Sequence, residues 1–273
     1  MIKCGITGSS GVLGKRIKNN LPYKFYEFKK DITKKNEVQN WIKKNNFDVL
    51  IHLAAKVPAR RVDRDYKKAF KVNVNGSLNL INALIEKKQK PKWLFYASTS
   101  HVYKLHHKLH KIDENETPKP QTKYGKTKLI AENYFRTKLK DSNIKLCIGR
   151  IFSFTDKRQK PPFVIPSLIK KIKLSKNKAT LKGLNHYRDF LSTRDIVLAI
   201  DTLRKKKAKG IYNIGSSKNF YLKDIATLIS KTFSKKIIFK DSKKKTYLIS
   251  NNKKIMKMRW KPKTYNTNLN YFY

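Results

Sequence analysis

The sequence predicts an α/β fold, in which a doubly wound parallel sheet carries a smaller C-terminal lobe. Short apolar runs alternate with amphipathic segments up to about residue 151, a glycine-rich turn follows the first run, and the alternation becomes irregular beyond that point. Alternating strands and helices favour right-handed crossovers and a sheet covered on both faces. The length of 273 residues suits one such unit with a second, smaller lobe.

The N-terminal elements follow from apolar patterning and from the glycine turn. The apolar run 1–6 predicts a first strand, after which the chain turns into a helix over 12–19. Residues 23–28 are apolar and aromatic, which favours a second strand. Residues 33–45 carry apolar side chains on one side at helical spacing, so a second helix is expected there.

The next elements continue the same alternation. Residues 48–53 are almost continuously apolar, as in a strand buried on both faces. Residues 66–88 repeat apolar side chains at helical spacing and predict one long amphipathic helix. A strand over 93–97, a helix over 121–139 and a strand over 144–148 complete this part of the chain.

Beyond residue 151 the pattern is less regular. Prolines at 161, 162 and 166 precede or open a helix that ends near Leu174. The tail from Lys235 is rich in Lys and Asn, and we assign no element to it. The other elements expected here are a helix over 192–205, a strand over 211–214 and a helix over 222–233.

A glycine-rich turn, Thr7–Gly14, follows the first expected strand. Its three glycines, Gly8, Gly11 and Gly14, permit a tight turn, close approach to a pyrophosphate and close packing of helix on strand. The N-terminus of the following helix would offer free N–H groups and a positive dipole end to phosphates. The turn therefore predicts dinucleotide binding, with an ordinary glycine turn as the alternative.

Tyr124 and Lys128 lie four residues apart on an expected helix and so share a face. A free Tyr has a pKa of about 10, too high for a base at neutral pH. A nearby Lys ammonium and an oxidised nicotinamide ring would both favour the phenolate and lower that pKa. Thr99, at the end of a neighbouring strand, can bind the same substrate oxygen, and Ser98 and Ser100 are further candidates. An exposed helix in a chain rich in Tyr and Lys is the alternative.

The glycine spacing, G-x-x-G-x-x-G, resembles that of the extended short-chain dehydrogenase/reductase family, whose members include sugar-nucleotide epimerases, dehydratases and reductases. Further matches follow in the family's order over nearly the whole chain. They are His52–Ala55, Asn73–Gly76, Ala97–Tyr103, Tyr124–Lys128, Arg188–Phe190, Tyr212–Gly215 and Trp260–Pro262. The resemblance implies a Rossmann-like NAD(P)-binding domain over 1–151, onto which later segments fold back, and a substrate-binding lobe over 152–273.

The resemblance also implies a reaction and its residues. Thr99, Tyr124 and Lys128 would be catalytic, in a hydride transfer between a sugar carbon and nicotinamide C4 for which Tyr124 takes or returns the hydroxyl proton. Lys128 would also hold the nicotinamide ribose. Arg188 matches an arginine that contacts the substrate diphosphate; an ion pair with Asp189 or Asp195 is the alternative. The residues implied for the nucleotide-sugar substrate are Ser100, Ser153 and Arg188.

The expected cofactor is NAD, with NADP as the alternative. Asp31 and Ile32 resemble the family's adenine-contacting pair, whereas Lys29 and Lys30 at the end of the second strand can bind a 2′-phosphate. The residues expected to bind the cofactor are Gly8, Ser10, Gly11, Val12, Leu13, Gly14, Asp31, Ile32, Leu53, Ala54, Ala55, Asn75, Tyr124, Lys128 and Ile151.

Two departures from the family pattern keep other functions open. Lys104 stands where a glycine is usual, and Ser153 replaces an asparagine. These departures motivate a non-catalytic dinucleotide-binding module as one alternative. The segment 31–33 and the short second strand resemble the deoxysugar-nucleotide reductase branch, which is a second. The notable His-rich stretch, with His106, His107 and His110, has no Cys or carboxylate at a ligand spacing nearby, so we expect a basic solvent loop and no metal.

The formal net charge of +47 raises nucleic-acid binding as a third alternative. Lys far outnumbers Arg and is spread over the whole length, whereas specific nucleic-acid readers concentrate Arg. We therefore expect no specific nucleic-acid partner, but attraction of anionic substrates such as nucleotides.

Other features of the sequence are unexceptional. Cys4 and Cys147 sit in apolar runs and are expected as buried, unpaired core residues. No apolar run approaches the roughly 18 residues that a membrane span needs, and no signal peptide is recognisable, so the expected compartment is the cytoplasm. The helices over 66–88 and 121–139 suggest a homodimer by resemblance.

Overall fold

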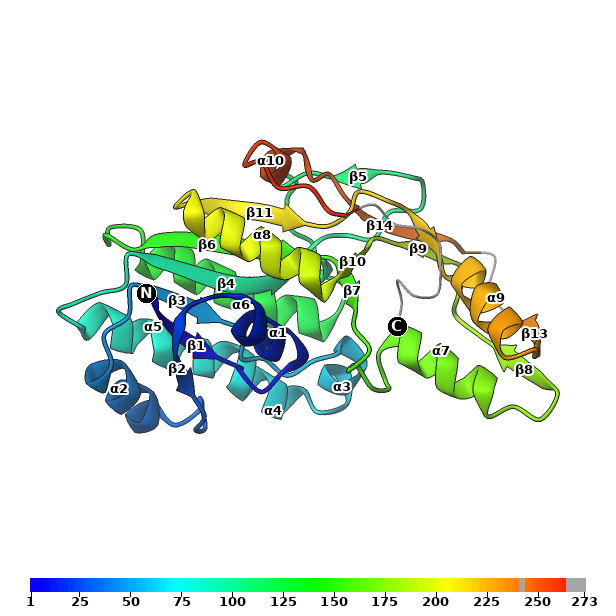
Figure 1. Ribbon diagram of the computed structural model, residues 1–273, viewed down its shortest axis with the longest axis horizontal. Coiled ribbons are helices and arrows are strands. Elements are labelled where there is room, and N and C mark those ends of the chain that lie inside the picture. The colour runs from blue at the N-terminus through cyan, green and yellow to red at the C-terminus, as the bar shows by residue number, and fades with distance from the viewer. Residues whose placement is uncertain (241–243, 264–273) are drawn as a thin grey trace.

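The computed structural model describes residues 1–240 and 244–263 (Figure 1). Its centre is a six-stranded sheet in the order β11-β6-β4-β3-β1-β2, in which every neighbouring pair is parallel. This confirms the predicted doubly wound parallel sheet. The strands are β1 (Lys3–Thr7), β2 (Lys24–Phe28), β3 (Val49–His52), β4 (Trp93–Thr99), β6 (Lys145–Ile151) and β11 (Gly210–Ile214).

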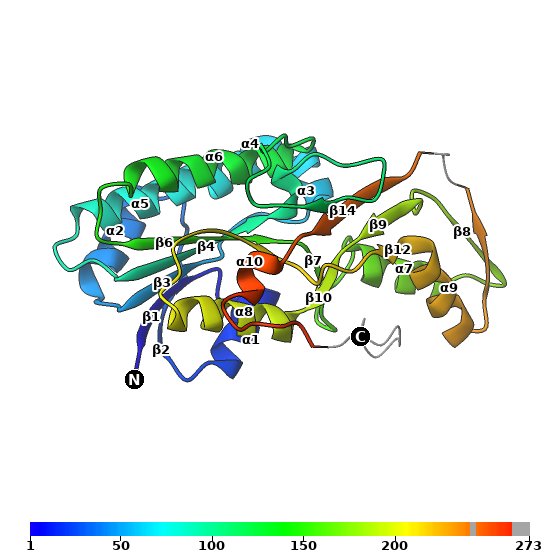
Figure 2. The same ribbon diagram turned by 90° about the horizontal axis from the view of Figure 1, so that it is seen from above.

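Helices cover both faces of this sheet (Figure 2). Two of them, α1 (Val12–Asn20) and α8 (Thr193–Lys205), pack together over one face. Three others, α2 (Lys35–Lys44), α5 (Gly76–Glu86) and α6 (Lys123–Lys138), cover the opposite face. Each face has its own apolar core, so the near-continuous apolar character of β3 and β4 follows from burial on both sides.

The chain direction across the sheet reverses at β1, since β2 pairs with one edge of β1 and β3 with the other. Thr7 at the end of β1 lies opposite Phe28 and His52. In parallel α/β sheets such a switch point opens a crevice at the carboxyl ends of the strands, where ligands bind. The glycine turn leaves β1 at this place.

The long helix expected over 66–88 is interrupted, which corrects the prediction. The structure has α4 (Tyr66–Phe70), then a π-helical turn η1 (Lys71–Asn75), then α5. The wider π turn places Asn73 inside the protein, where its amide is fully hydrogen-bonded. An unpredicted short helix, α3 (Ala59–Arg64), precedes this group; its residues are mostly charged and carry no apolar periodicity.

The second lobe is built from short strands whose partners are distant in sequence. Around its apolar core pack α7 (Val164–Lys173) and α9 (Leu222–Thr232). The small sheets are β12-β9-β14-β5, β10-β7 and β13-β8. Their strands are β5 (Lys111–Ile112), β7 (Ser153–Thr155), β8 (Lys178–Leu181), β9 (His186–Arg188), β10 (Phe190–Ser192), β12 (Phe220–Tyr221), β13 (Lys236–Phe239) and β14 (Thr246–Ser250).

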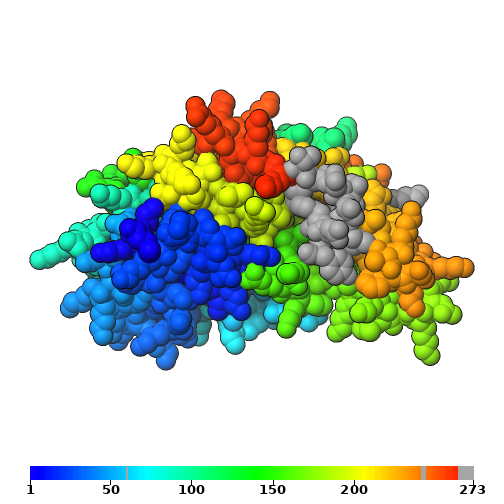
Figure 3. All heavy atoms as spheres, in the orientation of Figure 1, coloured from blue at the N-terminus to red at the C-terminus, as the bar shows by residue number. Residues whose placement is uncertain are grey.

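The tail from Lys235, to which we assigned no element, contains β13, β14 and α10 (Lys253–Met256). The expectation was wrong because these strands are stabilised by long-range pairing and not by local apolar periodicity. The tail also packs back against the six-stranded sheet and its helices. There α10 packs on β11, and Trp260 donates its indole N–H to the Asp195 carbonyl of α8. Figure 3 shows this red segment seated against the yellow segment that contains α8 and β11.

Two minor predictions are confirmed. Cys4 and Cys147 are buried, free thiols, and burial raises the pKa of each. None of the helices in residues 1–240 and 244–263 is long and apolar enough to cross a membrane.

Candidate active site

The glycine turn packs so tightly that two of its glycines leave no room for a side chain. Gly8 has a φ of +70°, and a Cβ there would lie 2.7 Å from the backbone N of Ala54. A Cβ on Gly14 would lie 2.4 Å from the Gly8 carbonyl oxygen. The turn closes through a 3.1 Å hydrogen bond from Gly11 N–H to Gly8 O, and Gly11 caps α1. The exposed rim of the turn, Ser10–Gly11, precedes free N–H groups at the helix start, so this part fits a dinucleotide phosphate.

The glycines of this turn make a graded test of its function. Gly14→Ala is expected to reduce stability, because its Cβ meets backbone that cannot yield. In Gly11→Ala the Cβ lies 3.3 Å from its nearest neighbour, Gly8 O, a distance that small shifts can relieve. We therefore expect Gly11→Ala to keep its melting temperature within about 2 °C and to lose about tenfold or more in dinucleotide affinity. Calorimetric titration beside thermal denaturation checks both; unchanged affinity in Gly11→Ala contradicts the phosphate site.

A buried histidine ties the ends of β1 and β3 together. His52 Nδ1 lies 2.6 Å from the Thr7 hydroxyl and Nε2 lies 3.0 Å from the Ser77 hydroxyl. Since Ser77 donates to the Asn73 carbonyl, the network is satisfied when Thr7 donates to Nδ1 and Nε2–H donates to Ser77. Burial lowers the pKa of His52 to about 3, so the ring is neutral. This network holds Leu53, Ala54 and Ala55 beside the glycine turn. These three residues, which we expected to bind the cofactor, are half-buried.

Asn73 connects this edge with the helix that carries the Tyr and Lys. Its side-chain oxygen accepts from Lys56 N–H at 2.7 Å, and its amide donates to Thr127 Oγ1 at 3.0 Å. Thr127 in turn donates to the Tyr124 carbonyl at 2.8 Å. The predicted Asn75 is exposed on the same π turn. Both asparagines belong to one sequence motif, from which we expected Asn75 to bind the cofactor; the π turn makes Asn73 the inward one.

Tyr124 is placed by a close approach of α6 to the 3-10 turn η2 (Ser100–Val102) that follows β4. A Cβ on Gly125 would lie 2.1 Å from the His101 carbonyl oxygen, so glycine is required there. Thr122 caps the helix by accepting from Gly125 N–H at 3.0 Å. The ring centroids of Tyr124 and His101 are 5.7 Å apart, edge to face.

Burial raises the pKa of Tyr124 to about 12, while a hydrogen bond with Thr99 acts in the opposite direction. From the sequence we expected Lys128 and an oxidised nicotinamide ring together to favour the phenolate. In the chain by itself, burial is the larger influence on the pKa of Tyr124.

Lys128 is buried and faces the aromatic ring of Tyr96. Only 2% of the residue is exposed, and its Nζ lies 4.2 Å from the Tyr96 ring centroid. Burial lowers the pKa of Lys128 to about 7, with the negative charge of Glu132 partly opposing the shift. The Lys128 side chain can therefore exist as the ammonium or as the neutral amine near neutral pH.

This burial predicts a stability gain when the charge is removed. The pKa of Lys128 falls from 10.5 to about 7 on folding, so across that window the unfolded chain binds a proton that the folded chain does not. Stability thus rises with pH in the window, and the full cost, at most roughly 5 kcal/mol, is present below pH 7. Lys128→Met should raise the melting temperature most at pH 6 and little near pH 10, in thermal denaturation. A gain independent of pH contradicts this origin.

A buried ion pair that we did not predict from the sequence lies one helical turn beyond Lys128. Glu132 binds Arg150 through Oε2 and Nη2 at 2.8 Å, and both side chains are almost fully buried. Ser98 donates its hydroxyl to the same carboxylate. Because Ser98 is engaged there, Thr99 is the residue of the Ser98–Ser100 cluster that contacts Tyr124. Glu132 lies at i+4 from Lys128, a spacing that could have indicated its charge interaction with Lys128 but not its pairing with Arg150.

The substrate-side residues approach the site from the second lobe. Arg188 in β9 donates to the Thr246 hydroxyl and carbonyl, each at 3.1 Å, and to the Tyr187 carbonyl at 2.7 Å. Burial lowers the pKa of His101 to about 4, and the charge of Arg188 lies close enough to contribute to this shift.

The Asp189 alternative for Arg188 is not what the fold uses. The Asp189 carboxylate accepts from the backbone and side chains of Ser216 and Ser250 and from the backbone of Ser217. The other expected substrate residues lie at two strand ends. Ser100 is buried in the 3-10 turn η2 (Ser100–Val102) after β4, and Ser153 is half-buried in β7.

The end of β2 presents charges of both signs. Asp31 is exposed, and hydrogen bonds from Thr33 hold its pKa low; Ile32 is buried against Gly76. Glu27 in β2 lies 2.8 Å from Lys18, and hydrogen bonds from Lys18 and Ser9 lower its pKa. Lys29 is exposed, 3.9 Å from Glu27. Ile151 ends β6 opposite Thr99.

Comparison with known proteins identifies the family. The family model described as "NAD dependent epimerase/dehydratase family" matches residues 5–215. The chain belongs to this family. Among its members, a dTDP-D-glucose 4,6-dehydratase of Dictyostelium discoideum is 30% identical over 223 residues, covering 77% of this chain and 50% of that protein. A GDP-6-deoxy-D-mannose reductase of Pseudomonas aeruginosa is 25% identical over 189 residues, covering 67% and 62%. The chain thus matches only half to three fifths of the length of these relatives.

Solved structures of this family share the fold. The structure of RMD from Pseudomonas aeruginosa, complexed with NADPH, aligns with a TM-score of 0.88 at 22% identity over 97% of this chain and 95% of that one. The UDP-glucose 4-epimerase of Thermus thermophilus, in complex with NAD, aligns with a TM-score of 0.84 at 19% identity, covering 97% and 95%. The predicted Rossmann-like fold is thereby confirmed.

Proposed function

We propose that this chain is an NAD(P)-dependent nucleotide-sugar epimerase or dehydratase that transfers a hydride between a sugar carbon and nicotinamide. The main support is the hydrogen bond between Thr99, at the end of β4, and Tyr124, at the start of α6, with the buried Lys128 one helical turn further along α6. They lie at the carboxyl edge of the sheet that also carries the glycine turn. A bound nicotinamide ring would supply the hydride acceptor and donor.

The residues have distinct roles in this proposal. Tyr124 takes the proton from the sugar hydroxyl as the carbon is oxidised and returns it on reduction, and Thr99 orients the same oxygen. Lys128, whose pKa of about 7 allows both charge states, stabilises the phenolate when protonated and binds the ribose of the cofactor. Burial of this group excludes water from the proton transfer.

NAD is the proposed cofactor, because two carboxylates lie near the place where β2 ends. Glu27 hydrogen-bonds with Ser9 of the glycine turn, and Asp31 follows the strand. A carboxylate there favours a free ribose 2′-hydroxyl over a 2′-phosphate. Lys29 and Lys30 are the residues that favour NADP, and both are exposed, with 76% of the Lys29 side chain accessible.

Calorimetric titration with NAD and NADP tests this site. It is carried out at physiological salt, with ATP as the control for non-specific phosphate binding by a chain of charge +47. Binding of one dinucleotide in preference to ATP supports the proposal and selects the cofactor. Equally weak binding of NAD, NADP and ATP contradicts the proposed dinucleotide site.

A reductase acting on a deoxysugar nucleotide is the second candidate, because one of the similar proteins is a GDP-6-deoxy-D-mannose reductase. An epimerase or dehydratase returns the hydride within one cycle, whereas a reductase consumes one reduced cofactor per product. Absorbance of the reduced nicotinamide during turnover of nucleotide sugars separates them. Binding of the cofactor without turnover of any nucleotide sugar would favour a non-catalytic module instead.

Arg188 is proposed to bind the substrate diphosphate. Its side chain is partly buried, burial lowers its pKa to about 10, and it is held by Thr246 close enough to His101 to lower the pKa of that ring. An Arg fork suits a phosphate. Arg188→Met is expected to raise KM for the nucleotide sugar by about 10–100-fold with a smaller change in kcat. Steady-state kinetics check this; a fall in kcat with unchanged KM contradicts the assignment.

A further inference from the structure

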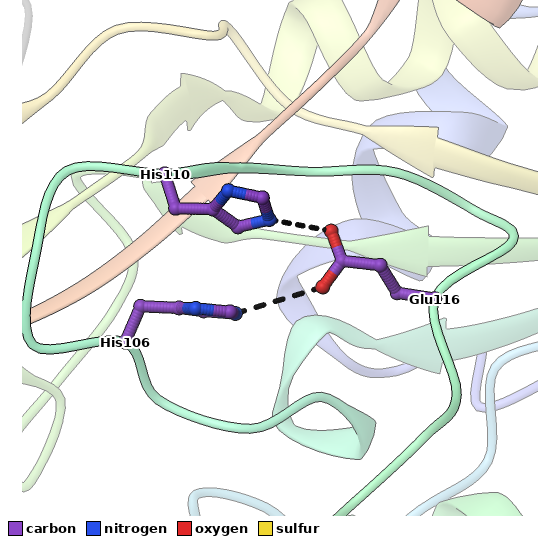
Figure 4. A group of neighbouring side chains, drawn as sticks. All are labelled: His106, His110 and Glu116. Atoms are coloured by element: carbon purple, nitrogen blue, oxygen red, sulfur yellow. Dashed lines mark hydrogen bonds and ion pairs between the residues drawn. The ribbon is translucent and has the colours of Figure 1, made fainter.

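Three side chains of the His-rich segment converge outside the site described above (Figure 4). Glu116 Oε1 lies 2.7 Å from His110 Nε2, and Glu116 Oε2 lies 3.6 Å from His106 Nε2. From the sequence we expected no carboxylate at a ligand spacing near these histidines. The fold corrects this, because the chain doubles back between His110 and Glu116 and brings the carboxylate between the two rings.

Each of the three residues is attached to a fixed part of the backbone. His106 exchanges two backbone hydrogen bonds with Tyr247 of β14, at 3.1 and 2.8 Å. His110 directly precedes β5, which pairs with β14. Glu116 closes a turn with Asp113, whose N–H donates to Glu116 Oε1 at 2.9 Å and so orients the carboxylate. The side chains are therefore arranged before any ligand arrives, which lowers the entropic cost of binding one.

The chemistry of the three groups is that of a metal ligand set. The Nε2 atom of His106 is removed from solvent and has no hydrogen-bond partner among the described residues. The three ligand atoms lie within 4.8 Å of one another. In a tetrahedral zinc site, bond lengths of about 2.0–2.1 Å separate neighbouring N and O ligands by roughly 3.3 Å. The separation of His110 Nε2 from Glu116 Oε1, 2.7 Å, and that of His106 Nε2 from the other carboxylate oxygen, Oε2, 3.6 Å, lie on either side of that value.

We propose that His106, His110 and Glu116 bind Zn²⁺ or a similar divalent transition metal ion, with water in the fourth position. Two imidazoles and one carboxylate are hard-to-borderline ligands that suit such an ion. The positive charge of Lys104, which lies close enough to act on His106, weakens the binding compared with neutral surroundings. His106 pairs with Tyr247, and the neighbouring residue of β14, Thr246, accepts a hydrogen bond from Arg188. The ion therefore stabilises the chain segment that lies beside Arg188.

Titration of the protein with Co²⁺ tests the site directly, because Co²⁺ at a low-symmetry N/O site gives a visible absorption band. The protein must be free of any histidine tag. We expect one equivalent of Co²⁺ to produce the band, Zn²⁺ to displace it, and saturating Zn²⁺ to raise the melting temperature by about 5 °C at a hundredfold excess over Kd. Absence of a saturable band overturns the proposal.

Variants identify the ligands. His110→Ala and Glu116→Gln should each weaken Co²⁺ binding by tenfold or more; Glu116→Gln preserves the volume of the side chain in case the alanine variant folds poorly. His107→Ala is the matched control from the same loop. Its ring is exposed and its Nδ1 lies 2.9 Å from the Lys245 carbonyl oxygen, outside the cluster. Unchanged binding in both ligand variants, or an equal loss in the control, overturns the assignment.

Discussion

Tyr124→Phe is expected to lower kcat by about 10²–10⁴-fold while leaving dinucleotide affinity nearly unchanged. The phenol oxygen is the group that exchanges a proton with the sugar hydroxyl in the proposed reaction, and phenylalanine keeps the ring that packs edge to face on His101. Since the backbone of Tyr124 is held by Thr127 and Asn73, the helix start should not move. Turnover of a nucleotide sugar and calorimetric titration of the cofactor measure the two effects.

Tyr134→Phe is the matched control, because Tyr134 lies on the same helix and 40% of it is exposed. It should retain the rate of the unmodified chain. A Tyr124→Phe variant with undiminished turnover would falsify the acid–base role. A loss of cofactor affinity equal to the loss of rate would instead indicate a structural defect at the site.

Glu132→Gln is expected to lower the free energy of unfolding by about 3–5 kcal/mol. The change leaves the Arg150 guanidinium charged in a place where 1% of the residue is exposed. Arg150 already has one nitrogen, Nη1, without a hydrogen-bond partner within the described part of the chain, and its remaining contacts are with Glu132 and the Tyr103 ring. Urea denaturation measures the loss.

Two further variants separate the ion pair from general disruption. Combining Glu132→Gln with Arg150→Met removes both charges. The double variant should recover much of the stability that Glu132→Gln loses, because no uncompensated charge is left buried. Glu86→Gln, at an exposed carboxylate, should change stability by less than about 0.5 kcal/mol. If the double variant is as unstable as Glu132→Gln, an uncompensated charge is not the cause.

The sequence by itself determined the parallel sheet, the glycine turn and the helical spacing of Tyr124 and Lys128. Each of these depends on residues close together in the chain: apolar runs for β3 and β4, the absence of Cβ atoms at Gly8 and Gly14, and one helical turn between the Tyr and the Lys. Local periodicity and backbone sterics therefore suffice to predict them.

Only the tertiary structure decided how these parts are joined and charged. The inward position of Asn73 depends on a π turn, and the pairs Glu132–Arg150 and Glu116–His106 form where the chain returns to itself. Burial, which depends on the packing around the site, raises the pKa of Tyr124 to about 12 in the chain by itself. The physical reason is that desolvation and long-range pairing depend on which segments lie side by side, and local spacing in the sequence carries no record of that.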